Sequence, residues 1–248
     1  MSWPEGYDLR VLDEVDSTNA EAARLAISLA GPTWILARRQ TAARGRRGRA
    51  WINPEGNLAA TLLMRPTETP DIVALRSFVA ALALHEALVM ATGRTAGLTL
   101  KWPNDVLLNG GKVAGILLES LGVRQGVQHL AIGIGVNLLH PPECAALEPG
   151  AVSPVALMSA TGVAVTPEEF LTLLAAAYAK VETLFVTQGF APVRQAWLLR
   201  AARLGETITA RAGGTETVGT FETVDAAGNL VLATGAGRAH IPAADVFF

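Results

Sequence analysis

The sequence predicts an α+β fold: a mixed β-sheet packed against helices over residues 1–204, then a small C-terminal β-barrel over residues 205–248. Half of the 248 residues are apolar, which is enough for a packed interior. Strand-type and helix-type apolar patterns both occur before Gly205. After Gly205 only short alternating segments remain, separated by glycine-rich turns, and this texture is typical of a small β domain.

The first elements are predicted from apolar runs and the signals at their ends. Strands are expected over residues 9–15, 34–37 and 58–64. Thr18-Asn19-Ala20-Glu21 has the pattern of a capping box, so a helix is expected from there to Ala30, before Gly31-Pro32. An apolar run predicts a long buried helix over residues 71–91, ended by Gly93. Its internal charges argue against a membrane span.

The middle of the chain is predicted to contain a hairpin, a further strand and a second long helix. Short strands over 98–101 and 106–108 flank a Trp-Pro-Asn-Asp turn, and Asn109-Gly110-Gly111 leads into a strand over 113–119. Residues 127–138 have a strand-like pattern. Thr166-Pro167-Glu168-Glu169 begins a helix that should run to Gln188, before Gly189. The C-terminal strands are expected over residues 207–211, 218–223 and 230–233.

Composition excludes several classes of protein. Cys144 is the only cysteine, so neither an internal disulfide nor a cysteine-based zinc cluster can form. The first ten residues have no basic start and no apolar run, so no signal peptide is expected and the cytoplasm is the default compartment. The net charge of −2 does not suggest a general nucleic-acid surface.

Arginines nevertheless concentrate in one loop. Six of them fall within twelve residues: Arg38, Arg39, Arg44, Arg46, Arg47 and Arg49. Gly45 and Gly48 would let the backbone approach a ligand closely, while guanidinium groups hold phosphate oxygens in pairs. The loop is not a Walker A site, because no Gly-Lys-Ser/Thr follows it. On spacing alone, an anion site and a solvated or nucleic-acid-binding arm are equally good interpretations.

Three other groups have polar chemistry and, individually, an ordinary structural explanation. Ser17-Thr18-Asn19 could bind a polar head group at a helix N-terminus or could simply cap that helix. Lys101-Trp102-Pro103-Asn104-Asp105 and Lys112 suit a Mg²⁺-bound triphosphate, but could also form a tight turn and a solvated lysine. The chain has only three lysines, and these are two of them. Gly133 and Gly135 suggest a close approach to a strand.

The order of these groups carries more information than any one of them. Ser-Thr-Asn, Arg-Gly-Arg-Arg-Gly-Arg-x-Trp, Lys-Trp-Pro-Asn-Asp, Gly-Lys-Val-Ala-Gly-Ile-Leu and Gly-Ile-Gly-Val-Asn follow one another between residues 14 and 138. This pattern resembles the biotin–protein ligase family. The resemblance implies a class II synthetase-like catalytic domain with a C-terminal β-barrel. It also implies the family's short form, because the motifs begin so early that a DNA-binding helix-turn-helix domain has no room before them.

The resemblance further implies which residues form the site. Catalysis would fall to Lys112 and Arg46. The residues expected to bind biotin are Ser17, Thr18, Asn19, Gln40, Arg44, Gly45, Arg46, Lys112, Gly133 and Gly135. Those expected to bind ATP are Arg46, Arg47, Arg49, Trp51, Asn104, Asp105 and Asn137, with Asp105 also a Mg²⁺ ligand. One departure is visible: Ala43 stands where family loops often have glycine, which removes an easy positive φ and could change how the loop closes.

The implied reaction activates biotin with ATP to biotinyl-5′-AMP and transfers it to a lysine of a biotin carboxyl carrier protein, such as that of acetyl-CoA carboxylase. A carboxylate is already nucleophilic at neutral pH, so the first step needs positioning and charge neutralisation, not a base. Asp105 is the candidate for assisting deprotonation of the lysine. We expect a monomer or homodimer that uses neither nucleic acid nor a membrane. The alternatives are a lipoate ligase or octanoyl transferase, a nucleic-acid-binding module, and a non-catalytic biotin sensor.

Overall fold

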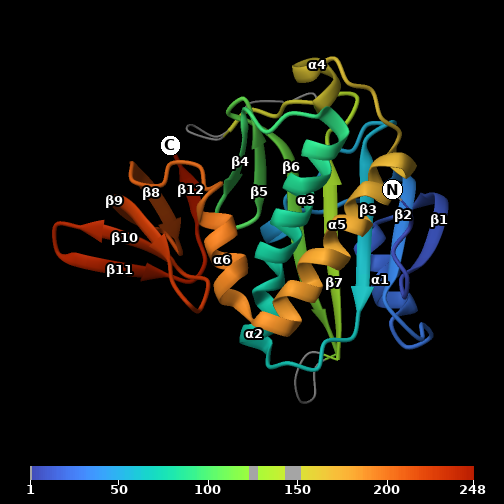
Figure 1. Ribbon diagram of the computed structural model, residues 1–248, viewed down its shortest axis with the longest axis horizontal. Helices are drawn as coiled ribbons and strands as arrows, with labels where there is room; N and C mark the ends of the chain where they lie inside the picture. The colour runs from blue at the N-terminus through green and yellow to red at the C-terminus, as the bar shows by residue number, and fades with distance from the viewer. Residues whose placement is uncertain (1, 123–127, 143–151) are drawn as a thin grey trace.

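A computed structural model describes residues 2–122, 128–142 and 152–248. Cys144 and the first residue of the predicted strand 127–138, Val127, lie outside the described residues. Two β-sheets organise the rest (Figure 1). The predicted fold class is confirmed: a mixed sheet carries helices on both faces, and a small antiparallel sheet follows it.

The large sheet has the strand order β1-β2-β3-β7-β6-β5-β4. Only β1 and β2 are parallel, and all other neighbours run antiparallel. Its strands are β1 (Asp8–Val15), β2 (Thr33–Gln40), β3 (Leu58–Met64), β4 (Leu98–Lys101), β5 (Asp105–Leu108), β6 (Gly111–Leu121) and β7 (His129–Val136). The β5–β6 hairpin turns at Asn109 and Gly110, both with positive φ, as the Asn-Gly signal predicts.

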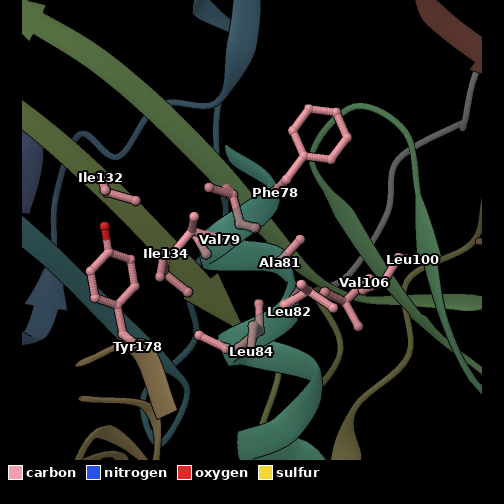
Figure 2. Packing of buried hydrophobic residues seen from close by; sticks show 14 of the residues in the cluster. Phe78, Val79, Ala81, Leu82, Leu84, Leu100, Val106, Ile132, Ile134 and Tyr178 are labelled. Atoms are coloured by element: carbon pink, nitrogen blue, oxygen red, sulfur yellow. The ribbon is translucent and has the colours of Figure 1, made fainter. Parts of the chain in front are cut away.

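One face of this sheet carries the main core, because alternate side chains of each strand point to it. Helices α3 (Arg76–Thr92) and α5 (Pro167–Gln188) cover that face, and α6 (Phe190–Leu198) packs against both of these helices (Figure 1). Figure 2 shows α3 side chains such as Val79 and Leu84 directed at Ile132 and Ile134 of β7 and at Tyr178 of α5. The predicted buried helix over residues 71–91 therefore serves as core.

Helix α1 (Thr18–Leu25) lies on the opposite face. It packs through Ala22 and Ala26 on Ile35, Leu63 and Ala131, which alternate along their strands with residues of the main core. The two faces thus differ in packing: the α3/α5 face is filled with apolar side chains, whereas α1 covers only part of the opposite face.

Two helices differ from the prediction. Thr18 is the first residue of α1, not its cap; Ser17 takes the cap position, no side chain caps the helix, and the helix ends at Leu25 and not at Ala30. The Thr18 side chain is engaged elsewhere, as described below. The predicted helix 71–91 is two helices, α2 (Pro70–Ala74) and α3, because tighter i+3 hydrogen bonds form on either side of Leu75.

The predicted start of the second long helix is confirmed. Helix α5 has the complete capping box, with Thr166 and Glu169 bonded reciprocally and Pro167 at the first position. Short helices α4 (Leu157–Thr161) and α6 were not predicted. The segments 70–92 and 167–188 are long and apolar enough to cross a membrane by length and composition, yet 72% and 50% of their apolar windows are buried inside the molecule, as in core helices.

The small sheet has the strand order β11-β10-β9-β8-β12, all antiparallel. Its strands are β8 (Thr207–Ala212), β9 (Thr215–Val224), β10 (Leu230–Thr234), β11 (Gly237–Ile241) and β12 (Asp245–Phe247). Within the described residues β11 and β12 are its edges and do not pair with each other, so the small sheet resembles a barrel that is not closed. The boundary between residues 204 and 205 stays a prediction. The indole of Trp102 donates a hydrogen bond to the Gly228 carbonyl, which ties this sheet to the large one.

Candidate active site

A cavity of about 380 Å³ opens on the α1 face of the large sheet and collects most of the predicted site residues. Its wall combines the start of α1, the end of β2, the 43–52 loop, the 101–105 turn, the centres of β6 and β7, and the C-terminal strand β12. A larger and more open hollow of about 850 Å³ lies along α6, but none of the predicted site residues line it. Chemistry, not size, therefore selects the first cavity.

One end of this cavity belongs to a hydrogen-bonded set that we call the α1 network: Thr18, Asn19 and Gln40, which line the cavity, and Thr61 and Glu119, which are bonded to them but do not line it. Gln40 Oε1 accepts from the Thr18 N–H at 2.8 Å and lies 3.2 Å from the Thr18 hydroxyl. Thr61 Oγ lies 2.7 Å from Thr18 Oγ and 2.6 Å from Asn19 Oδ1. Asn19 Nδ2 donates to Glu119 Oε2 at 2.6 Å.

The α1 network explains why Thr18 does not cap its own helix. Its backbone N–H and its hydroxyl both have partners across the sheet, and it is only 4% exposed. Buried polar atoms must find such partners, and here the partners are one another. The predicted grouping of Ser17, Thr18, Asn19 and Gln40 is what the structure brings together.

Two glycines of β7 make room for neighbouring side chains. A Cβ atom on Gly133 would collide with the Asn19 amide, and one on Gly135 would come within 2.5 Å of the Trp51 indole. Gly115 on β6, paired with Gly135, also faces Trp51. The glycines therefore form a flat floor on which Asn19 and Trp51 rest, which is the close approach that their sequence pattern indicates.

Lys112 lies beside this floor. Its Nζ is 2.7 Å from Asp105 Oδ1 and 5.5 Å from the centre of the Trp51 ring. Lys101 also lines the cavity, and burial lowers its pKa, with Asp105 opposing that effect. The turn and the hairpin thus hold Lys112 and Asp105 as an ion pair. A phosphate or carboxylate group of a ligand can replace Asp105 as the partner of Lys112.

The arginine loop (residues 43–51) lies across the opening. Arg46 donates to Asn104 Oδ1 at 3.2 Å and to the Ala244 carbonyl at 3.4 Å. Burial lowers the pKa of Arg46, while Asp245 and Asp105 oppose the shift. Arg47 and Arg49 lie 2.6 and 3.2 Å from Asp245 Oδ2. The C-terminal sheet therefore supplies anchors for a loop that belongs to the first 60 residues.

The loop's backbone differs from what its glycines suggest. Positive φ falls on Arg47 and Gly48, whereas Gly45 is extended and has ordinary space for a Cβ. Ala43 is not among the described residues with positive φ. In this conformation its methyl group therefore creates no backbone strain.

Two predicted ATP-binding residues lie outside the cavity lining. Arg47 is directed to Asp245 on the surface, with 46% of its side chain exposed. Asn137 is 1% exposed, and its Nδ2 donates to the Lys112 and Val155 carbonyls. Asn137 therefore supports the backbone of Lys112 from behind. The remaining predicted residues line the cavity: Ser17, Thr18, Asn19, Gln40, Arg44, Gly45, Arg46, Arg49, Trp51, Asn104, Asp105, Lys112, Gly133 and Gly135.

Sequence reasoning missed Thr61, Glu119 and Asp245. Thr61 is the one polar residue in the apolar strand β3, and this could have marked it as a site residue. Glu119 is an even number of residues from Gly115 on β6 and so faces the same side of the sheet, which could have marked it too. Nothing near Asp245 in the sequence points to a loop two hundred residues away.

A Mg²⁺ ion fits this site only in company with its substrate. The described residues contain no group of three or more His, Cys, Asp or Glu side chains that could hold a metal. Asp105 offers one carboxylate, already paired with Lys112. One carboxylate together with substrate phosphates is an ordinary Mg²⁺ environment.

The chain matches two family models. Residues 11–137 match the biotin/lipoate A/B protein ligase family, and residues 204–248 match the biotin protein ligase C-terminal domain. A biotin--[acetyl-CoA-carboxylase] ligase of Paracoccus denitrificans is 58% identical over 238 residues, covering 96% of this chain and 99% of that one. The bifunctional ligase/repressor BirA of Bacillus subtilis is 30% identical over 247 residues, covering 97% of this chain and 74% of that one.

Solved structures agree. The biotin protein ligase of Aquifex aeolicus in complex with biotin and ATP superimposes with a TM-score of 0.82 and 27% identity, covering 96% of this chain and 97% of that one. The chain therefore belongs to the biotin/lipoate A/B protein ligase family and is, within it, a biotin–protein ligase, an enzyme that uses ATP and biotin as substrates.

Proposed function

We propose that this cavity activates biotin with ATP to biotinyl-5′-AMP and transfers the biotinyl group to a lysine of the biotin carboxyl carrier domain of acetyl-CoA carboxylase or a related carboxylase. The observation that carries the proposal is the convergence of the α1 network, Lys112 and the arginine loop on one cavity. This arrangement offers uncharged polar groups at one end and cations at the other. Biotin adenylate has the same polarity, with a neutral cyclic urea at one end and a phosphate at the other.

In the first step a biotin carboxylate oxygen attacks the α-phosphorus of ATP, and the bond from that phosphorus to the β-phosphate bridge breaks to release pyrophosphate. Lys112 would hold the carboxylate and the α-phosphate together once they replace Asp105 as its partner. Arg46, partly desolvated against Ala244, would neutralise the charge that develops on the phosphate. Asp105 would hold Mg²⁺ brought in with ATP, and the ion would further neutralise the phosphates.

The urea would lie against Ser17, Thr18 and Gln40, with Asn19 and Gly133 behind it. Arg44 and Gly45 would close over the ring, and Gly135 would leave space beside Trp51. Trp51, Asn104 and Arg49 would bound the nucleotide, with Arg47 at the rim and Asn137 supporting Lys112.

In the second step the neutral amine of the carrier lysine attacks the carbonyl carbon of the mixed anhydride, AMP leaves with the electron pair of the broken C–O bond, and the amine loses a proton. Asp105, once released from Lys112 by the phosphate, would assist that loss. A monomer or homodimer in the cytoplasm, without nucleic acid or a membrane, would suffice for both steps.

Transfer of labelled biotin to a purified carrier domain, with and without ATP, tests the proposal. We expect ATP-dependent labelling that is lost when the carrier lysine is replaced by arginine. Lipoate in place of biotin separates the nearest rival activity, since the family model at residues 11–137 includes both kinds of ligase. Labelling by lipoate but not by biotin would overturn the proposal, as would biotin labelling that is independent of ATP.

A further inference from the structure

The α1 network ends on a carboxylate that does not touch the cavity. Glu119 lies on β6, on the same face as Gly115 and Leu117, which do line the cavity. It is partly buried, and its Oε2 accepts from Asn19 Nδ2 at 2.6 Å. Asn19 and Thr61 in turn connect it to Thr18, which lies in the wall where a ligand would bind.

An ionised carboxylate can accept hydrogen bonds but cannot donate them, so Glu119 fixes the orientation of its neighbour. Asn19 must present its NH₂ group to Glu119 and its oxygen to Thr61. Thr61 has one hydroxyl proton, and the 2.6 Å contact to the Asn19 oxygen requires that proton. Thr61 can then only accept from Thr18, whose hydroxyl lies 2.7 Å away.

The same count decides what Thr18 presents to the cavity. Its single proton points to Thr61, at a shorter distance than the 3.2 Å to Gln40 Oε1. Gln40 Oε1 is served instead by the Thr18 backbone N–H at 2.8 Å. Both lone pairs on the Thr18 oxygen are therefore left as acceptors.

We propose that Glu119 is a positioning residue that sets the direction of the Asn19–Thr61–Thr18 hydrogen bonds, and that the Thr18 hydroxyl is thereby fixed as an acceptor for a ring N–H of the cyclic urea. This proposal rests on the proposed function, because it takes biotin as the ligand at this end. A site that requires an N–H donor rejects an isostere with an acceptor there, since two lone pairs would face each other. Glu119 thus determines specificity from outside the cavity.

The experiment compares biotin with its cyclic carbamate analogues, in which an oxygen replaces one or the other ring N–H. The measured quantity is the ratio of dissociation constants, analogue over biotin, by titration calorimetry on the full chain. We expect the wild-type protein to prefer biotin over at least one analogue by on the order of 100-fold, the effect of an unpaired polar group in a dry site.

Two variants should remove the fixed direction of the Asn19–Thr61–Thr18 hydrogen bonds. Glu119→Gln can accept or donate, and Thr61→Val interrupts the connection, so in both the ratio should fall by about tenfold. Thr61→Ser keeps the hydroxyl and should keep the wild-type ratio. Glu222→Gln, which changes a carboxylate on β9 paired with Arg238, is the matched control and should also keep it.

The KM for ATP and the melting temperature of each variant separate positioning from damage. We expect both to stay near wild type in Glu119→Gln. An unchanged ratio in Glu119→Gln would overturn the proposal, and so would an equal loss of affinity for biotin and for the carbamates. Failure of the wild-type protein to bind biotin at all would instead refute the proposed function.

Discussion

The two ends of the active-site cavity are built in opposite ways. At the α1 network, polar side chains are buried and bond one another: Thr18 is 4% exposed and Thr61 fully buried. In the arginine loop, Arg47 and Arg49 keep 46% and 56% of their side chains exposed, and they pair with Asp245 of the C-terminal sheet. The first end is ordered by its own contacts, whereas the second depends on a distant segment. The end proposed for the urea is therefore preorganised, and the end proposed for the phosphate can exchange its partners.

The largest effect is expected where the two ends meet. Lys112→Ala removes the ammonium that lies between Asp105 and Trp51, so biotin-dependent release of pyrophosphate should fall by about 1000-fold or more, roughly 4 kcal/mol of transition-state stabilisation. Lys180→Ala, which breaks an exposed pair with Glu86, is the control and should retain full activity. Near wild-type release by Lys112→Ala would remove Lys112 from the mechanism.

Substitutions at the two floor glycines should separate the two ends. Gly133→Ala forces the Asn19 amide to move, so the Kd for biotin should rise by roughly 100-fold, because a preorganised network cannot adapt cheaply. Gly135→Ala displaces Trp51 instead and should mainly raise the KM for ATP. Gly31→Ala, with open space around its Cβ, should change neither constant. If both floor variants impaired only ATP binding, the assignment of the ends would be wrong.

Arg46→Gly should weaken retention of the intermediate. Without the guanidinium that lies against Asn104 and Ala244, biotinyl-AMP should dissociate about tenfold faster, equivalent to about 1.4 kcal/mol. Chromatography of the reaction mixture would then detect free biotinyl-AMP. Arg39→Ala, an exposed arginine paired with Glu14, provides the comparison. Intermediate held as tightly by Arg46→Gly as by the wild type would contradict the assigned role.

The smallest effect concerns the anchor of the loop. Asp245→Asn weakens the pairs with Arg47 and Arg49, so trypsin should cut the ligand-free loop about threefold faster, which corresponds to less than 1 kcal/mol for partly exposed pairs. Biotin and ATP together should abolish the difference, because phosphate then replaces the carboxylate. Asp225→Asn, in the turn between β9 and β10 and paired with His240, should be cut at the wild-type rate. Equal cutting of all three proteins would show that Asp245 does not hold the loop.

Local signals predicted those features that depend on near neighbours in the chain. The capping box of α5 and the Asn-Gly turn of the β5–β6 hairpin formed as their residues indicate. The apparent capping box at Thr18 did not, because Gln40 and Thr61, distant in sequence, offer the Thr18 side chain and backbone better partners. The expected helix 71–91 is interrupted at Leu75, where i+3 bonds replace α-helical ones.

The sequence by itself determined the family, the fold class and a set of site residues of which all but Arg47 and Asn137 line the cavity, because each motif is a short run whose residues lie together in any fold that contains them. Tertiary structure alone decided what those residues contact. The position of α1 on the large sheet brought Asn19 to Glu119 of β6, and the position of the C-terminal sheet brought Asp245 to Arg47 and Arg49 of the arginine loop. Such contacts join positions a hundred or more residues apart, and no local periodicity or end signal records them.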